Sequence, residues 1–391
     1  MAPIPVIGVG AISSLGSTAK QGFGAIAQAR DGISPLRLFD SGLKTPPLCA
    51  QVHTIPGSDN APNRTAALAL CAAQESLAPI ENRDGLSLGI VVATTVAGMA
   101  RSELFYKQLR LDPGYIENAG RELAFHEPAA LSGFLCGALN AQGFYTLSTA
   151  CSTGLHAVGM AKRLVETGAF DLCVAIGADA LSLLTIRGFS SLMLIDPSGC
   201  KPFDAGRAGI SLGEGAGALC LASQKALRVT GVKPLAFASG WGASADCYHM
   251  TAPHPDGAGA VLAVRAALKE AGCLPADIDL IATHGTATPD NDFAEINAMR
   301  AVFGNLPLFC SMKRSIGHTL AASGALEAVY SVCALQKGIV PPTAGFGQLD
   351  DKINATPALF QRKELRHILK NSFGFGGNNA VVVLSRENGR D

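Results

Sequence analysis

Short aliphatic segments alternate along this chain with longer, alanine-rich segments. The short segments have the length of buried strands, and apolar residues in the longer ones recur at the spacing of a helix face. The strand candidates are 5–10, 88–95, 145–149, 172–176, 216–222, 280–283, 306–310 and 380–385. The helix candidates are 61–77, 152–166, 257–271, 291–303 and 316–337. This alternation predicts a layered α/β protein.

Composition narrows the function classes that such a fold serves. The chain has 391 residues, and its 31 basic and 31 acidic side chains give a net charge of zero. A disordered chain combines low hydrophobicity with high net charge, whereas hydrophobic residues make up 48% of this one. A nucleic-acid binder that depends on phosphate contacts normally has a basic surplus. We therefore expect a large globular protein with much buried surface and no nucleic-acid partner.

One stretch, residues 128–161, carries no charged side chain. Polar residues and glycines interrupt it, so it lacks the ~20 consecutive apolar residues that span a bilayer. We therefore expect no membrane insertion, and a deeply buried segment at a subunit interface instead. The N-terminus shows no secretory signal, because no basic region precedes an apolar one. The eleven cysteines include no Cys-x-x-Cys pair, and we expect a reducing, cytoplasmic location.

A faint internal repeat indicates two similar halves. In the first half a strand leads into residues 148–154 and then a helix, and in the second half a strand leads into residues 311–318 and then a helix. Each half also opens with a strand that runs into a loop of small residues, at 238–246 in the second half. We therefore expect an N-terminal half over 1–229, which holds a candidate cysteine, and a C-terminal half over 230–391.

Two glycine-rich motifs invite readings that their spacing does not support. Gly8-Val-Gly10 follows a strand, but the third glycine of a dinucleotide fingerprint is replaced by Ser13. The segment 213–217 holds three glycines, yet no Gly-Lys-Ser/Thr follows as in a phosphate-binding loop. We expect both motifs to mark close backbone packing, and this disfavours an oxidoreductase of the Rossmann type.

Cys151 lies between a strand candidate and the helix candidate 152–166. A thiol at the first turn of a helix is exposed to the partial positive charge of unpaired amides, which lowers its pKa and favours the thiolate. A sharp turn from strand to helix also exposes the sulfur and directs backbone N–H groups in front of it. Cys151 is therefore a candidate nucleophile for acyl transfer. The alternative of an inert buried cysteine stays open here, and we expect it for the other ten.

Two histidines lie in glycine-flanked turns after strand candidates. His284 is followed by Asp290 and Asp292, and His318 is preceded by Lys313. A neutral imidazole at a helix N-terminus is a good hydrogen-bond donor to a developing oxyanion, and the helix dipole keeps its pKa low. Metal binding is disfavoured, because His-Glu-x-x-His and Cys-x-x-Cys companions are missing and the lysine would compete with the metal. We expect no metal.

Six motifs occur in order and together extend over nearly the whole chain. They are Ser148–Gly154, Lys201–Asp204 with Arg207 and Gly213–Gly217, His284–Thr288, Lys313 with Gly317-His318, Asn371–Gly377 and, less distinctive, Ser244–Thr251. The set resembles a β-ketoacyl-[acyl carrier protein] synthase of the elongating, decarboxylating type. That resemblance implies the thiolase fold, an α/β architecture in which two similar halves stack into five αβαβα layers.

The same resemblance implies an acyltransferase with a Cys-His-His centre. Cys151 would take the growing acyl chain as a thioester. His284 and His318 would assist loss of carbon dioxide from malonyl-carrier protein and stabilise the enolate, which attacks the thioester to give a β-ketoacyl product two carbons longer. Lys313 would orient or polarise the histidines, with Glu327 as its carboxylate partner.

Further roles follow from the resemblance alone. The N–H groups of Cys151 and Phe375 would form the oxyanion hole, and the Phe375 ring would gate the acyl pocket. Thr251, Thr286 and Thr288 would contact the phosphopantetheine arm of acyl carrier protein. No metal or organic cofactor is implied, because the thioester serves as the electron sink. The chain would work as a homodimer, or as a heterodimer with a chain-length-factor-like subunit, in fatty acid or polyene/polyketide biosynthesis.

Four positions depart from the pattern of that family. Ala287 replaces a glycine or serine, Arg314 replaces a small residue, and Asn378 replaces a threonine. Met193 stands where a basic residue for the acidic carrier is common. These departures leave the carrier, the acyl chain length and saturation, and the pathway open.

The motifs also bear on rival functions. A chain-length-factor homologue would have the fold without the nucleophile, and Cys151 argues against it. A priming synthase would use Cys-His-Asn and a thiolase a second active-site cysteine, and the set of His284, His318 and Lys313 disfavours both. A structural interaction protein would leave the motifs unexplained. A non-elongating acyltransferase of the same fold, or a chain-length-factor-like partner subunit, stays the alternative.

Overall fold

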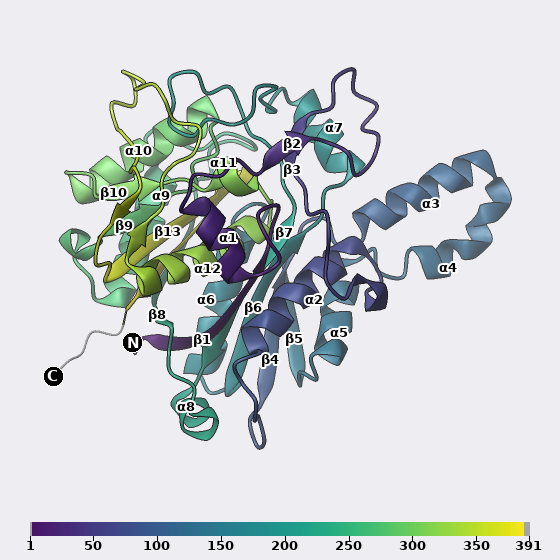
Figure 1. The fold of residues 1–391 in the computed structure, drawn as a ribbon, viewed down its shortest axis with the longest axis horizontal. Helices are drawn as coiled ribbons and strands as arrows, with labels where there is room; N and C mark the ends of the chain where they lie inside the picture. The colour runs from purple at the N-terminus through teal and green to yellow at the C-terminus, as the bar shows by residue number, and fades with distance from the viewer. Residues whose placement is uncertain (1, 387–391) are drawn as a thin grey trace.

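A single mixed sheet of ten strands forms the framework of the computed structural model, which describes residues 2–386 (Figure 1). The half formed by the first part of the chain has the order β5 (Gly143–Leu147), β4 (Leu88–Ala93), β6 (Leu172–Asp179), β7 (Gly215–Ala222) and β1 (Ile4–Ile12). The other half continues with β8 (Ala236–Ala245), β14 (Asn378–Ser385), β13 (His367–Gly374), β9 (Leu280–Ala282) and β10 (Leu308–Cys310). The halves meet where Ile4–Val6 of β1 pairs with Ala236–Ala238 of β8. The division of the chain at residue 230 stays a prediction.

Helices cover both faces of each half sheet. Helix α2 (Arg64–Leu77) packs on the outer face of the first half, and α9 (Ala258–Ala271) and α10 (Pro289–Phe303) lie outside the second. Helices α6 (Thr153–Glu166) and α12 (Ala322–Lys337) lie between the halves, each in contact with strands of both. The expected five layers are therefore confirmed.

The two middle helices cross at a pair of glycines. A Cβ atom added to Gly154 of α6 would lie 2.6 Å from the backbone N of Ala325, and one added to Gly324 of α12 would lie 2.7 Å from the N of Leu155. Because neither backbone leaves room for a methyl group, only glycine permits this approach. The contact lies close to the starts of both helices, which follow Cys151 and His318.

The remaining elements are short and connect or flank the layers. They are α1 (Ala19–Ile26), β2 (Ile33–Pro35), β3 (Leu48–Ala50), α3 (Met99–Leu111), α4 (Ala119–Glu122), α5 (Pro128–Ala138), α7 (Leu183–Ser191), α8 (Gln224–Thr230), α11 (Lys313–Ile316), β11 (Ile339–Val340) and β12 (Gln361–Arg362), with 3-10 turns at Ser58–Asn60, Pro113–Asn118, Pro275–Asp277 and Phe375–Gly377.

All eight strand candidates correspond to strands, but two predicted elements differ. The helix expected over 316–337 is interrupted, because α11 ends at Gly317 with φ of 70° and α12 begins only at Ala322. Residues 238–246, expected to form a loop, belong mostly to strand β8. That strand lacks β-branched residues because α9 lies directly on it: a Cβ atom at Gly242 would lie 2.0 Å from Ala263 O.

The uncharged stretch 128–161 is buried only in its last part. Strand β5 lies at the edge of the sheet, and Phe144 and Tyr145 are 43% and 42% exposed in the single chain. The outer edge of this strand has no neighbouring strand among the described residues, so its expected burial at a subunit interface stays a prediction. Helices α3 and α4 extend away from the body on the same side of the molecule (Figure 1). No helix in residues 2–386 is long and apolar enough to cross a bilayer.

The two glycine motifs pack backbone against backbone, as expected. A Cβ atom at Gly8 would lie 1.9 Å from Ser76 O of α2, and one at Gly10 would lie 2.0 Å from Ala72 O. In the second motif, a Cβ atom at Gly217 would lie 2.4 Å from the backbone of Leu326 in α12. Both motifs therefore set the distance between a strand and a helix.

This packing predicts that Gly8→Ala destabilises the protein. The added methyl group has to push α2 away from β1, and overpacking of this kind costs about 1–3 kcal/mol of unfolding free energy. Gly24→Ala is the matched control, because Gly24 lies in helix α1 with no atom within 4 Å of the new Cβ. That control is expected to gain about 0.5–1 kcal/mol. Denaturant titration measures both, and equal stabilities would contradict the packing argument.

Candidate active site

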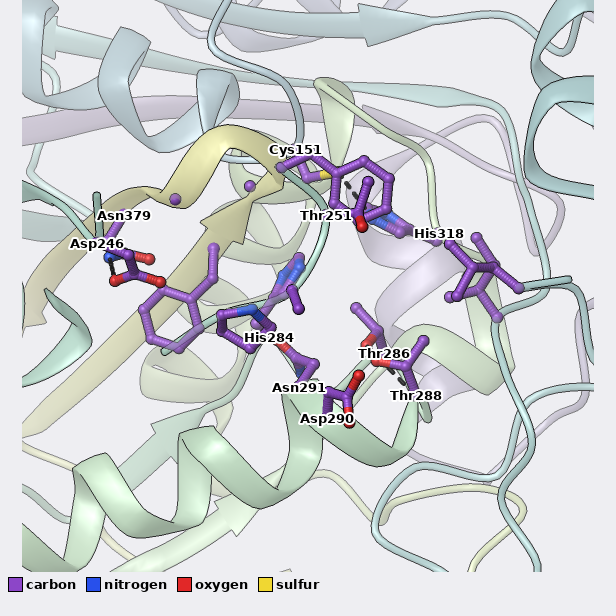
Figure 2. Close-up of a pocket in the computed structure, with 18 of the residues that line it drawn as sticks. Cys151, Asp246, Thr251, His284, Thr286, Thr288, Asp290, Asn291, His318 and Asn379 are labelled. Carbon is purple, nitrogen blue, oxygen red and sulfur yellow. Dashed lines mark hydrogen bonds between the residues drawn. The ribbon is translucent and has the colours of Figure 1, made fainter. Parts of the chain in front are cut away.

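Three segments that are distant in the sequence bring Cys151, His284 and His318 to one cavity with an empty volume of about 660 Å³ (Figure 2). Cys151 follows strand β5, His284 follows β9, and His318 lies between α11 and α12. Phe375 and the three predicted threonines line the same cavity. Lys313 and Glu327 lie behind its wall, so every side chain of the predicted site lies in or next to one place.

The Cys151 turn is tighter than the sequence indicates. Helix α6 begins at Thr153 with Ser152 as its N-cap, so Cys151 precedes the N-cap instead of lying in the first turn. Ala150 adopts φ of 51°, a left-handed conformation that reverses the chain direction just before the cysteine. The Thr153 hydroxyl accepts a hydrogen bond from the Thr149 N–H at 2.8 Å and holds the turn closed.

Burial, not the helix, dominates the acidity of this thiol. Cys151 is 6% exposed, and loss of water raises its pKa to about 11. The Lys313 ammonium and the N–H groups of Phe375 and Cys151 act in the opposite direction but do not outweigh burial. The expectation of a lowered pKa is therefore wrong, since the sulfur is sequestered in the core. The thiol is protonated at neutral pH and needs a base.

His318 is the candidate for that base. Its Nε2 lies 3.1 Å from Cys151 Sγ, and its Nδ1 lies 3.0 Å from Ser323 Oγ. Burial lowers the pKa of His318, and the nearby ammonium groups of Lys313 and Lys370 lower it further, so the imidazole is neutral. Because the Ser323 hydroxyl can donate to Nδ1 or accept from it, both neutral tautomers are satisfied. The imidazole can therefore accept a proton at Nε2 and also present one there.

His284 is the second imidazole in the cavity. Its ring lies 5.4 Å from the His318 ring, centroid to centroid, and nearly perpendicular to it at 84°. The Glu295 carboxylate fixes the turn, because it accepts the N–H groups of His284 and Gly285 at 2.8 Å each. Burial, followed by Lys313, lowers the pKa of His284. Its Nδ1 is buried and has no hydrogen-bond partner among the described residues.

A buried ion cluster lies behind the two histidines. The Glu327 carboxylate pairs through one oxygen with Lys313 and through the other with Lys370, both at 2.5 Å. All three side chains are at most 2% exposed, and none lines the cavity. The pairing of Lys313 with Glu327 agrees with the resemblance. Sequence reasoning missed Lys370 and Glu295, because polar residues lie close to Lys370 in strand 367–374 and nothing in the local sequence marks either residue as buried.

The loop after β13 brings Phe375 next to Cys151. A Cβ atom at Gly374 would lie 3.1 Å from the backbone N of Cys151, and the Ser372 hydroxyl donates to Cys151 O at 3.0 Å. The N–H groups of Phe375 and Cys151 both act on the sulfur. The Phe375 ring lies 5.7 Å from the Phe189 ring, at the apolar end of the cavity.

The opposite end of the cavity is polar. Thr286 and Thr288 have their hydroxyl oxygens 3.0 Å apart, and Thr251 also lines this space (Figure 2). Asp290 and Asn291 lie beside these two threonines in Figure 2. Sequence reasoning missed a second polar group on the other side of His284 in that view, in which Asn379 donates to Asp246 at 2.7 Å. Within residues 2–386, no group of three or more His, Cys, Asp or Glu side chains is arranged to hold a metal ion.

Other motif residues fasten loops around the site. Asp204 accepts the N–H groups of Gly206, Gly347 and Gln348. Glu214 pairs with Arg64 at 2.6 Å and accepts two backbone N–H groups. Neither carboxylate lines the cavity, so both are structural parts of their motifs.

The structure shows the contacts or the exposure of the four positions that depart from the family pattern. Ala287 is buried with φ of 68°, and its N–H is bound by Asp292 at 3.1 Å. Arg314 pairs with Asp31 at 2.6 Å, and the Asn378 amide donates to Phe375 O at 3.3 Å. Met193 is 86% exposed.

Comparison with known proteins shows which family the chain belongs to. The models of the β-ketoacyl synthase N-terminal and C-terminal domains match residues 1–226 and 235–347. The chain is 34% identical to 3-oxoacyl-[acyl-carrier-protein] synthase 2 of Rhizobium meliloti, over 82% of this chain and 80% of the relative. It is 30% identical to nodulation protein E of a Rhizobium species, over 97% of this chain and 98% of the relative.

Solved structures of ketosynthases have the same fold as this chain. The ishigamide ketosynthase/chain length factor has a TM-score of 0.90 and 28% identity, with 99% of both chains covered. A type II polyketide ketosynthase in complex with its acyl-carrier protein, AntDE:AntF, has a TM-score of 0.88 and 26% identity, also with 99% of both chains covered. The thiolase fold expected from the motifs is therefore confirmed.

Proposed function

Because this chain belongs to the β-ketoacyl synthase family, we propose that it extends an acyl chain held on Cys151 by condensation with a malonyl group on acyl carrier protein. The protein is an acyltransferase of the 3-oxoacyl-[acyl-carrier-protein] synthase type. One observation carries the proposal: Cys151 Sγ lies 3.1 Å from His318 Nε2 in a cavity that His284 also lines.

The first step transfers the acyl group. The Cys151 thiol passes its proton to His318 Nε2 as the sulfur attacks the carbonyl carbon of the acyl-carrier thioester. The N–H groups of Cys151 and Phe375 stabilise the oxyanion that forms. When the C–S bond to the carrier breaks, the proton returns from the imidazole to the departing pantetheine sulfur. This leaves the acyl chain on Cys151 and both histidines neutral.

The second step uses the histidines as hydrogen-bond donors. Loss of carbon dioxide from the malonyl thioester moves an electron pair towards the thioester oxygen, and imidazole N–H groups of His284 and His318 stabilise that charge. The enolate carbon then attacks the acyl carbonyl on Cys151, and the C–S bond to the cysteine breaks. The product is a β-ketoacyl thioester on the carrier, and the Cys151 thiolate takes up one proton from water, relayed by His318 Nε2.

The remaining groups position the reactants. Lys313 holds Glu327 and keeps a positive charge behind the histidines. Thr251, Thr286 and Thr288 lie where a pantetheine arm that reaches Cys151 would pass, and their hydroxyl groups match its amides. Phe375 separates this polar entrance from the apolar end of the cavity and gates the acyl chain. No metal or organic cofactor takes part in the proposed steps, because the thioester carbonyl accepts the electron pair.

The exposed edge of the sheet supports a dimer. Strand β5 presents unpaired backbone groups together with Phe144 and Tyr145, and unprotected edges of this kind normally pair. We propose that a second copy, or a chain-length-factor-like subunit, covers it. All eleven cysteines are unpaired, in keeping with a reducing compartment such as the cytoplasm.

A carrier-protein panel tests this function. The purified protein is offered saturated and polyunsaturated acyl-carrier proteins together with malonyl-carrier protein, and the products and the assembly are followed by intact and native mass spectrometry. We expect a β-ketoacyl product two carbons longer, equimolar carbon dioxide and a dimeric mass. The preferred acyl chain separates fatty acid from polyene synthesis. Acylation of Cys151 without chain extension would identify a non-elongating acyltransferase instead.

A further inference from the structure

Lys370 is a buried charge that the proposed steps do not use. It lies inside strand β13 with 0% of its side chain exposed. Its ammonium contacts Glu327 Oε2 at 2.5 Å, Asn371 O at 2.5 Å and Thr283 O at 2.9 Å. Its hydrogen bonds go to the carbonyl oxygens of Ala282, Thr283 and Asn371, which match the three N–H donors of an ammonium group, and the Glu327 carboxylate adds an ion pair.

Two of these contacts lead directly to the catalytic groups. Thr283 O belongs to the peptide that precedes His284, so Lys370 fixes the start of the turn that presents this ring. Glu327 Oε2 belongs to the carboxylate that holds Lys313 through its other oxygen. Lys370 therefore braces the histidine turn and the ion pair behind it at the same time.

The positive charge of Lys370 is not needed to neutralise the Glu327 carboxylate. Lys313 alone would neutralise Glu327, and burial of a second ammonium carries a large desolvation cost. The groups around the histidines come from six elements: Lys313 of α11, Glu327 of α12, Lys370 of β13, Glu295 and Asp292 of α10, Asp179 of β6 and Cys310 of β10, together with Cys151. Removal of Lys370 would lower the charge of this cluster by one unit.

We propose that Lys370 is a positioning residue of the active site, whose ammonium braces the turn before His284 and holds a positive charge that keeps both histidines unprotonated. This inference rests on the proposed function. A protonated imidazole cannot accept the Cys151 proton, so the charge extends the pH range in which the thiol is activated. Lys370 contributes to the lowered pKa of both histidines, after burial and Lys313 for His318 and after burial, Lys313 and His318 for His284.

Loss of the Lys370 charge changes the pKa of both histidines in a direction that can be stated. A nearby cation disfavours the imidazolium, so its removal raises the pKa of both histidines. In Lys370→Met, more imidazole is then protonated at a given pH below neutrality. The acid limb of Cys151 alkylation by iodoacetamide, and of kcat/KM for condensation, is expected to move to higher pH by about one unit. The rate on the alkaline side of that limb changes less.

Three further variants separate charge from packing. Lys162→Met is the matched control, because Lys162 is equally buried, pairs with Glu270 at 2.5 Å and does not line the cavity. Its acid limb is expected to stay in place even if its melting temperature falls. Lys370→Gln keeps hydrogen-bond donors without charge and should reproduce the shift if Lys370→Met does not fold. Lys370→Arg keeps the positive charge, so its acid limb should stay at the wild-type pH.

Alkylation distinguishes this inference from the proposed function. Iodoacetamide reports on the Cys151 and His318 pair whether or not condensation occurs. An unchanged acid limb in both neutral variants would overturn the role of Lys370. Failure of the wild-type protein to decarboxylate malonyl-carrier protein, with the alkylation shift present, would overturn only the proposed function.

Discussion

Cys151→Ser is expected to lower condensation by a factor on the order of 10⁴ or more, because no other group in the cavity can carry the acyl chain. In the wild-type protein, brief treatment with an acyl-carrier thioester should acylate Cys151 alone. Burial raises the pKa of Cys49, Cys220 and Cys310 to about 12 each, and none of these lines the cavity. Peptide mapping of the acylated protein measures the selectivity.

Cys247 is the control for this experiment. It is exposed to solvent and does not line the cavity. Cys247→Ser should therefore leave both acylation and condensation unchanged. An acyl label on Cys247 or any other cysteine, with Cys151 unmodified, would remove the nucleophile from the mechanism.

His284→Ala and His318→Ala are each expected to lower malonyl decarboxylation by about 10²–10³-fold, the usual loss when one oxyanion donor is removed. The two variants should differ in a second assay. Alkylation of Cys151 should slow in His318→Ala, which lacks the base 3.1 Å from the sulfur, and should persist in His284→Ala. Release of labelled carbon dioxide and iodoacetamide kinetics measure the two effects.

His156→Gln is a suitable control for the histidine variants. His156 lies on α6 with its ring 5.9 Å from the Trp241 ring, and it is not among the residues that line the cavity. The His156→Gln variant should therefore decarboxylate malonyl-carrier protein at the wild-type rate. Condensation at the wild-type rate by either cavity variant would show that its imidazole has another role.

The sequence predicted what depends on local pattern. Apolar runs located eight strands, and the position of a cysteine between a strand and a helix pointed to Cys151 as the candidate nucleophile, because both features depend on neighbouring residues. The pairing of Lys313 with Glu327 came only from resemblance to a family. Strand β8 was missed because the closeness of α9 selects glycine and alanine there, and these residues carry no strand signal.

What could not be predicted depends on contacts between distant segments. The pKa of Cys151 is set by how completely the fold removes water, and no local pattern shows this. Lys370 looks like an ordinary charge in the sequence, and Glu295 like the polar face of a helix. Only the stacking of β13, α10 and α12 places the lysine beside Glu327 and the glutamate under the turn that holds His284.

The glycine crossing of α6 and α12 fixes the two helix starts that lie beside Cys151 and His318. Cys151 and His318, the proposed nucleophile and base, each precede one of these two helices, and both helices contact strands of both halves of the sheet. The distance between sulfur and imidazole is therefore as rigid as the core itself. Differences in the size of the bound acyl chain are then expected to be absorbed at the apolar end of the cavity, by the segments that carry Phe189 and Phe375. Substitutions in those segments can change the substrate range without disturbing the reacting pair.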